Sequence, residues 1–239
     1  MTPYAATYDG RTHDVYKVGA GPAVIVIHEI PGLHQGVLAF GERVAAAGFT
    51  AYMPHLFGAV GGKMTVGASL RQMARACVSR EFSTWALNRT SPITTWLRAL
   101  AKDAHRACGG PGVGAVGMCL TGGFALAMAV DPWLLAPVLS QPSIPFAITP
   151  ARRRDIGVSP EDLAAVKARD VCVMGLRYTG DPAVPGARFQ RLRDELGDRF
   201  IAIEIAGRGH SVLTEHLDVD ALERVLAFFA DRLRPRAEG

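Results

Sequence analysis

Short apolar runs alternate with helical segments along this chain, and that alternation constrains the fold more than any other feature. The run AVIVIHE at 23–29 is β-branched and almost continuously apolar, which is typical of a strand buried on both faces of a parallel sheet. The next segment, 37–49, has the apolar spacing of an amphipathic helix. We predict further strands at 50–54, 113–118, 136–140, 171–178 and 200–207, and the helices that separate them at 96–107, 120–130, 163–168, 189–196 and 221–233.

Strands that alternate with helices in this way predict an α/β fold with a mostly parallel, doubly wound sheet. The N-terminal segment YAATYDGRTHDVYKV differs, because its apolar residues alternate on both sides of Asp9-Gly10, a pair that favours a tight hairpin turn. We therefore expect an antiparallel hairpin to open the sheet. Ser159-Pro160 is a good helix start, since serine caps free amides and proline suits the first turn. With 239 residues, 49% of them hydrophobic, we expect a single domain over 1–239.

Composition excludes several classes of function. The N-terminus lacks the pattern of a signal peptide and no segment is apolar for the length of a membrane span, so we expect a cytoplasmic protein without a membrane partner. The four cysteines show no Cys-x-x-Cys spacing, so neither a metal site nor a disulfide framework is indicated. The net charge of +4 comes mainly from arginine clusters such as 152–154, which we interpret as solvated surface, not as a nucleic-acid interface.

Four groups of chemical interest each follow a predicted strand. In doubly wound sheets, ligands bind beyond the carboxyl ends of the strands, so these positions are the first candidates for a site. Glu29 lies in HEIPG, directly after the first buried strand, and Cys119 follows VGAVGM. Asp181 lies in TGDPAVP and His210 in GRGHSVL. Cysteine, aspartate and histidine thus occur in the order nucleophile, acid, base that is typical of the α/β-hydrolase arrangement.

These residue types suit nucleophilic catalysis at a carbonyl group. A thiol attacks well only as thiolate, so His210 would accept the proton of Cys119 while Asp181 orients the imidazole ring. The oxyanion would be held by backbone N–H groups, for which we predict those of Ile30 and Leu120. Two simpler interpretations remain open from the residues alone: Cys119 as a buried core thiol, and Asp181 before a proline as a turn residue.

The chain resembles the dienelactone hydrolase family of α/β-hydrolases. The resemblance rests on VIVIHEIPGL, AAGFTAYMPHLFG, VGMCLTGGFALA, TGDPAVP and GRGHSVL, which lie in the family's order. It implies an α/β-hydrolase fold, a triad of Cys119, Asp181 and His210, and a glutamate, here Glu29, that pairs with the resting cysteine and helps to form the thiolate. It also implies hydrolysis of an ester or lactone through an acyl-thioenzyme, with no metal and no organic cofactor.

Three features depart from the family pattern or lie outside it. Thr121 occupies the first of two positions after the cysteine where the family has glycine. The dienelactone-cleaving member has an arginine a few residues beyond its histidine to grip a substrate carboxylate, whereas HSVLTEH here has Thr214 and no arginine. The sequence therefore does not predict dienelactone itself as the substrate. We interpret the irregular stretch 57–88 as a lid or pocket wall, and Arg80 within it as a substitute anchor for a carboxylate, with a plain surface arginine as the alternative.

Three functions remain open at this point. The first is a cysteine-dependent hydrolase of a small ester or lactone. The second is an acyltransferase that uses the same thioester, and the third is a non-catalytic protein that binds a small ligand in the same pocket. His28, His34, His55 and His216 are expected to line the mouth or to lie on the surface without a catalytic role. The oligomeric state is not predicted.

Overall fold

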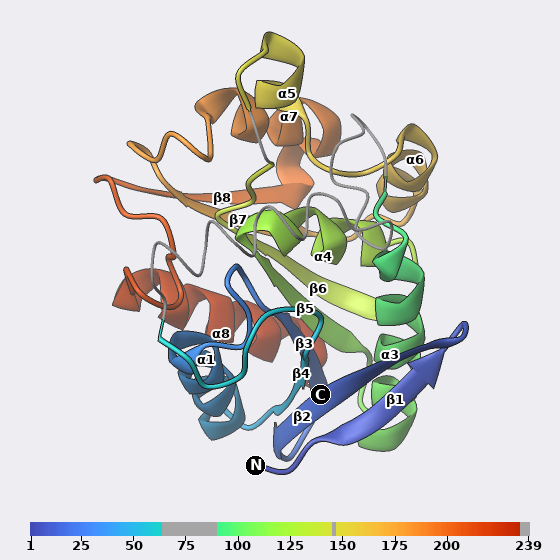
Figure 1. Cartoon of the computed structure of the whole chain (residues 1–239). Coiled ribbons are helices and arrows are strands. Elements are labelled where there is room, and N and C mark those ends of the chain that lie inside the picture. The colour runs from blue at the N-terminus through green and yellow to red at the C-terminus, as the bar shows by residue number, and fades with distance from the viewer. Residues whose placement is uncertain (64–89, 145–146, 235–239) are drawn as a thin grey trace.

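The computed structural model describes residues 1–63, 90–144 and 147–234, and a mostly parallel sheet runs through its centre (Figure 1). Within these residues the sheet has eight strands in the order β1-β2-β4-β3-β5-β6-β7-β8. β1 pairs with β2 and β2 with β4 in antiparallel fashion, and all other pairs are parallel. The strands are β1 (Tyr4–Tyr8), β2 (Arg11–Gly19), β3 (Ala23–Ile27), β4 (Thr50–Pro54), β5 (Val113–Met118), β6 (Leu134–Ser140), β7 (Val173–Tyr178) and β8 (Phe200–Ile205). The predicted fold class is confirmed.

The N-terminal hairpin turns at Asp9 and Gly10. Both residues have positive φ angles, 51° and 72°, which is the conformation that a two-residue type I′ turn requires at its centre. Tyr8 then pairs directly with Arg11 across the turn. The Asp-Gly pair therefore forms the turn because aspartate tolerates the left-handed region and glycine adopts it without strain.

Helices cover both faces of the sheet and create two separate cores (Figure 1). On one face, α1 (Gln35–Ala46) and α8 (Val219–Leu233) bury apolar residues such as Phe40 and Phe229. The other face is covered by α3 (Ile93–Cys108), α4 (Gly122–Met128), α6 (Pro160–Ala168) and α7 (Gly186–Leu196). β3 shows why its sequence is continuously apolar: Val24 and Val26 pack into the first core, whereas Ile25 and Ile27 pack into the second.

The helix ends follow local capping rules where the sequence supplies a cap. The Ser159 hydroxyl accepts a hydrogen bond from the N–H of Asp162, so α6 begins at Pro160 as expected. The cluster at 152–154 forms the end of a short helix, α5 (Pro150–Arg154), which the apolar pattern did not predict. Its start is nevertheless encoded, because Thr149 caps the N–H of Arg152 and Pro150 occupies the first turn.

None of the helices in the described part of the chain is long and apolar enough to cross a membrane. Most of the stretch 57–88 that we interpret as a lid or pocket wall falls in 64–89, outside the described residues.

Candidate active site

The parallel strands end at one edge of the sheet, and the segments that follow them carry the predicted site residues. β3, β5, β7 and β8 are followed by Glu29, Cys119, Asp181 and His210, respectively. Because neighbouring parallel strands place their carboxyl ends together, four segments that are distant in the sequence meet at this edge. Hydrogen bonds then show which of the side chains the fold brings into contact.

Cys119 lies on a sharp turn between a strand and a helix. It follows β5 directly, has a φ angle of 55°, and opens the 3₁₀ turn η1 (Cys119–Thr121), after which α4 begins. The turn is tight: a Cβ on Gly117 would lie 2.2 Å from the carbonyl oxygen of Thr121, and one on Gly122 would lie 2.6 Å from Pro142 Cβ. Only glycine fits these two positions, so the surrounding sequence is adapted to present the side chain of Cys119 at the edge of the sheet.

Thr121, the departure from the family pattern, is fully buried in this turn. Its Oγ1 accepts a hydrogen bond from the N–H of Met118 at 2.9 Å, and its hydroxyl hydrogen faces the carbonyl oxygen of Ile27 at 3.0 Å. The carbonyl oxygen of Met118 lies at 2.9 Å as a second acceptor. A threonine therefore fits here because its hydroxyl joins the cysteine turn to the end of β3.

His210 and Asp181 form a close pair. Nδ1 of His210 lies 2.6 Å from Oδ2 of Asp181, and Oδ1 of Asp181 accepts a hydrogen bond from the N–H of Ala183 at 2.9 Å. The other ring nitrogen is left for Cys119, which lies close enough to His210 to contribute to the shift of its pKa. Burial alone would lower the pKa of His210, but the contacts with Asp181 and Cys119 outweigh it and raise the pKa to about 11.

Cys119 has a second neighbour, which sequence reasoning missed. The Oγ atom of Ser143 lies 2.9 Å from Sγ of Cys119, and the N–H of Ser143 donates to the carbonyl oxygen of Cys119 at 2.9 Å. Ser143 lies just beyond β6, whose carboxyl end reaches the same edge of the sheet. The position of Ser143 after a strand could have suggested a site residue. The segment SQPS contains no ionisable side chain, however, so the search for reactive groups did not select it.

Glu29 is buried, with a relative exposure of 1%, and its carboxylate accepts hydrogen bonds from four side chains. The donors are His34 Nε2 at 3.2 Å, Gln141 Nε2 at 3.0 Å, Ser211 Oγ at 2.8 Å, and Thr214 Oγ1. Burial alone would raise the pKa of Glu29, but these hydrogen bonds outweigh it and the pKa is lowered. The contacts of Glu29 thus lie within this polar cluster, whereas the described contacts of the Cys119 thiol are with Ser143 and His210.

Gln141 connects this cluster to the segment that carries the histidine. It has a positive φ angle of 35°, donates to Glu29, and accepts a hydrogen bond from the N–H of Val212 at 3.3 Å through Oε1. Ser211 and Thr214, which donate to Glu29, lie in the same segment. The cluster therefore holds the residues directly after His210 by three separate contacts.

The histidines outside the predicted triad have structural partners. His34, expected at the mouth or surface, is buried against Glu29, and its Nδ1 accepts from the N–H of Gly36 at the start of α1. His28 is fully buried: burial lowers its pKa to about 3, and its Nε2 accepts from the N–H of Leu56 at 3.1 Å. These contacts join β3 to its neighbouring segments.

The predicted oxyanion donors lie within the described residues, whereas the predicted carboxylate anchor does not. Ile30 and Leu120, the predicted oxyanion donors, are both buried and directly follow Glu29 and Cys119. Arg80, the predicted carboxylate anchor, lies outside the described residues.

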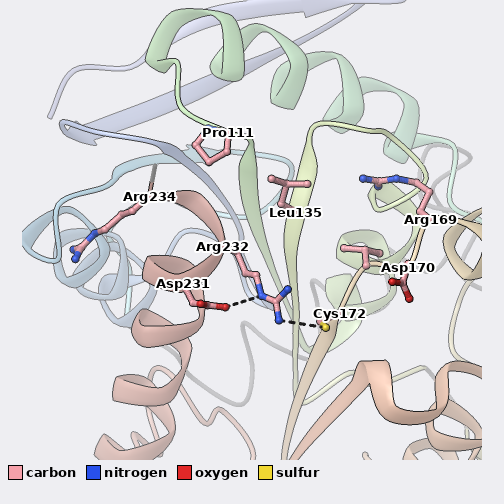
Figure 2. Close-up of a pocket in the computed structure, with 9 residues that line it drawn as sticks. Pro111, Leu135, Arg169, Asp170, Cys172, Asp231, Arg232 and Arg234 are labelled. Carbon is pink, nitrogen blue, oxygen red and sulfur yellow. Dashed lines mark hydrogen bonds and ion pairs between the residues drawn. The ribbon is translucent and has the colours of Figure 1, made fainter. Parts of the chain in front are cut away.

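A cavity of about 460 Å³ opens at the opposite edge of the sheet, where β5 and β7 begin (Figure 2). Its arginines already have partners: Arg232 pairs with Asp231 at 2.9 Å and donates to Sγ of Cys172 at 3.3 Å. Arg169 and Arg234 donate to backbone carbonyl groups. This cavity is therefore separate from the cluster around Cys119 and lacks its acid–base pair.

Comparison with known proteins identifies relatives of both the sequence and the fold. The sequence model of the dienelactone hydrolase family matches residues 9–230, and no curated protein matches the sequence. Among solved structures, dienelactone hydrolase from Anabaena variabilis is 15% identical, with a TM-score of 0.66 and coverage of 98% of this chain and 99% of that chain. Est1E from Butyrivibrio proteoclasticus is 14% identical, with a TM-score of 0.63 and coverage of 96% and 98%. A cold-adapted esterase from an Arctic intertidal metagenomic library is 14% identical, with a TM-score of 0.64 and coverage of 97% and 93%.

Proposed function

Because the chain belongs to the dienelactone hydrolase family and is a carboxylic ester hydrolase, we propose that it cleaves a small ester or lactone through a thioester on Cys119. The observation that carries the proposal is the close pair of Asp181 and His210, with Cys119 near enough to raise the pKa of that histidine. The thiol stands on a turn with a positive φ angle at the end of a central strand, which is where this fold presents its nucleophile.

In the first half of the reaction, the thiolate of Cys119 attacks the carbonyl carbon of the substrate. The carbonyl electron pair moves to oxygen, and the N–H groups of Ile30 and Leu120 are proposed to stabilise that oxyanion. When the carbonyl group re-forms, the C–O bond of the ester breaks and protonated His210 gives its proton to the leaving alkoxide. The acyl group is then attached to sulfur, and in a lactone the new hydroxyl group stays tethered to it.

In the second half, water releases the acyl group. Neutral His210 takes a proton from water as the oxygen attacks the thioester carbonyl, and the C–S bond breaks to return the thiolate and release a carboxylic acid. The contact of 2.6 Å between Asp181 and Nδ1 supports a role in which the carboxylate keeps that nitrogen protonated and so directs Nε2 toward the sulfur.

Glu29 remains a proposed member of this machinery, and its contacts suggest a route for its effect. The carboxylate accepts a hydrogen bond from Ser211, the residue directly after His210, and from Thr214 in the same segment. In this conformation Glu29 therefore acts as a positioning residue for the histidine. Direct pairing with the thiol would require the carboxylate to give up some of these donors. Arg80 stays a prediction as the anchor for a substrate carboxylate.

The proposal is tested with Cys119→Ala and p-nitrophenyl acetate. The variant is expected to lose ester hydrolysis by about three orders of magnitude or more while keeping its fold, because its side chain attacks the substrate. Mass spectrometry of the proteolytic peptides of wild-type protein quenched during turnover should detect an acetyl group on the peptide that contains Cys119. Cys172→Ala, which removes another free thiol, is the matched control and should keep full activity. Undiminished turnover by purified Cys119→Ala would overturn the proposal.

A further inference from the structure

Ser143 touches the proposed nucleophile at two places. Its hydroxyl oxygen lies 2.9 Å from Sγ of Cys119, and its backbone N–H donates to the carbonyl oxygen of the same residue at 2.9 Å. The backbone contact fixes the position of Ser143 relative to the turn, so the proximity of its hydroxyl to sulfur follows from the fold. A half-buried hydroxyl at this distance is a hydrogen-bond partner of the thiol in its resting state.

Either atom can donate in this hydrogen bond while Cys119 is a thiol, but ionisation of the sulfur leaves Ser143 as the donor. A thiolate has no hydrogen to donate and can accept from several donors, whereas His210 and Ser143 can both donate to it. Resting on the proposed function of Cys119, we propose that Ser143 is a second hydrogen-bond donor to its thiolate and that the two donors together control its ionisation. Ser143 is then a catalytic residue, because its hydroxyl touches the reacting atom.

Arg188 holds Ser143 in this place. Its guanidinium is buried, with a relative exposure of 1%, and donates to the carbonyl oxygen of Pro142, the residue before Ser143, at 2.8 Å. The same Nη1 atom donates to the carbonyl oxygen of Ala183 at 3.2 Å, in the turn where the N–H of Ala183 holds Asp181. Arg188 on α7 thus joins the segment next to the nucleophile to the segment that carries the acid, and is a positioning residue.

The remaining contacts of Arg188 explain why it is anchored so firmly. It also donates to the carbonyl oxygens of Asp155 at 2.5 Å and Arg152 at 3.0 Å. A planar guanidinium with five N–H groups can serve several carbonyl groups at once, which a lysine ammonium cannot do with the same geometry. The charged groups that interact with the thiol are His210 and Arg188, and Asp181 pairs with His210 from a third segment.

Ser143→Ala should make the thiol harder to ionise. Loss of a hydrogen bond to a charged group is expected to raise the midpoint pH of Cys119 alkylation by about one to two pH units. A more basic thiolate is also a poorer leaving group, so release of the acyl group should slow and the acyl-enzyme should accumulate during turnover.

The experiment measures the rate of iodoacetamide labelling of Cys119 across a pH series, by mass spectrometry of the labelled peptide. Wild type, Ser143→Ala and Ser143→Thr are compared, and circular dichroism checks their folding. Ser143→Thr keeps the hydroxyl, so its midpoint pH of Cys119 alkylation should lie within about half a pH unit of the wild-type value. An unchanged midpoint in folded Ser143→Ala would overturn the proposal.

A second arm tests the role of Arg188. Arg188→Lys keeps the positive charge but loses the planar guanidinium that serves several carbonyl groups. The midpoint pH of Cys119 alkylation should therefore rise, as in Ser143→Ala, but by a smaller amount. If Arg188 acts through Ser143, the double variant should show no more than the shift of Ser143→Ala alone. Fully additive shifts would overturn the positioning role.

The outcome also separates this inference from the proposed function. If Cys119 is not the nucleophile, Cys119→Ala keeps its turnover and alkylation of Cys119 leaves hydrolysis intact. If only the role of Ser143 is wrong, alkylation of Cys119 still abolishes hydrolysis, while Ser143→Ala leaves the midpoint where it is in the wild type.

Discussion

At the scale of single residues, the hydroxyl of Thr121 links two parts of the site that would otherwise be held only by the strands. It accepts from the N–H of Met118 beside the nucleophile and faces the carbonyl oxygen of Ile27 at the end of β3. The segment after β3 carries Glu29 and Ile30. Thr121, which departs from the glycine pattern of the family, therefore connects the turn of the proposed nucleophile to the segment of the proposed oxyanion donor.

Thr121→Val is expected to destabilise the protein by about 1–3 kcal/mol, because it keeps the shape but leaves the buried N–H of Met118 without its acceptor. The free energy of unfolding is measured by urea denaturation. Thr121→Ser, which keeps the hydroxyl, is the matched control and should be the less destabilised of the two. Equal stability of Thr121→Val and wild type would show that the hydroxyl contributes nothing.

Glu29→Gln preserves the shape of the side chain but removes its charge. The charge-assisted hydrogen bonds from Ser211 and Thr214 weaken, so the His210 segment loses part of its support and kcat should fall by about tenfold or more. The measurement is kcat with p-nitrophenyl acetate together with the pH profile of Cys119 alkylation. A lower kcat with an unchanged alkylation profile would indicate positioning of the histidine, whereas a shifted profile would indicate direct action on the thiol. If neither changes, Glu29 has no part in the reaction.

The same carboxylate predicts a pH dependence of stability. Since the pKa of Glu29 is lowered in the folded protein, its contribution is present above the unfolded pKa and is lost as the pH falls through the folded one. The stability difference between wild type and Glu29→Gln should therefore be largest near neutral pH and shrink below about pH 4. Urea denaturation at a series of pH values measures it.

Sequence reasoning found the ionisable residues of the site more readily than the neutral ones. Cys119, Asp181 and His210 could be proposed because each is reactive and each follows a strand. The contacts of Ser143 and Gln141 depend on the path of the backbone after β6. The positive φ angle of Gln141 is part of that path, and no local sequence pattern predicts it. The direction of the Glu29 carboxylate likewise depends on partners from segments that follow three different strands.

At the scale of elements, the turn between β7 and α7 determines the position of Asp181, the proposed acid. Asp181 is held by the N–H of Ala183, and the carbonyl group of Ala183 is held by Arg188 on the helix that follows. The carboxylate is thus preorganised to receive Nδ1 of His210 before any substrate arrives. The position of the acid is a property of this strand–turn–helix unit, not of Asp181 alone.

Asp181→Asn is expected to lower kcat/KM by about a thousandfold or more, because an amide can favour the wrong tautomer of His210. The pKa of His210, raised to about 11 in the wild type, should fall. The raised pKa contributes stability that is fully present below the unfolded value of about 6.5 and is lost as the pH rises through the folded value. The stability difference between wild type and variant should therefore decrease in alkaline solution.

The measurements are the pH–rate profile and urea denaturation over the same pH range. Asp194→Asn is the matched control, because Asp194 is an exposed carboxylate whose ion pair with Arg154 lies on the surface. It should keep wild-type kcat/KM. Activity of Asp181→Asn close to that of wild type would contradict the proposed role of the acid.

The elements themselves could be predicted where burial leaves a pattern. β3 was recognisable because both of its faces are buried, and α6 because a serine and a proline mark its start. α5 was missed because five residues are too few for an apolar period to emerge. Its cap, Thr149, was the signal that the pattern-based prediction did not use.

At the scale of the whole molecule, the fold class followed from the alternation of strands and helices, but the arrangement of the sheet did not. β2 pairs with β4 and not with β3, its nearest successor in the sequence. That choice depends on how the segment through α1 crosses over the sheet, and on packing against the layer shared by α1 and α8. Such information is distributed over the chain and has no local signature.

The site is assembled from segments that are far apart along the chain, and this has a consequence for biosynthesis. Glu29 and Ser211, which are in hydrogen-bond contact, are separated by 182 residues. On the ribosome, Cys119 emerges well before the segment that carries His210, so the nascent chain contains the thiol without its proposed base. With the roles proposed for Cys119 and His210, a polypeptide released before β8 and the segment after it are made would lack the base that activates the thiol.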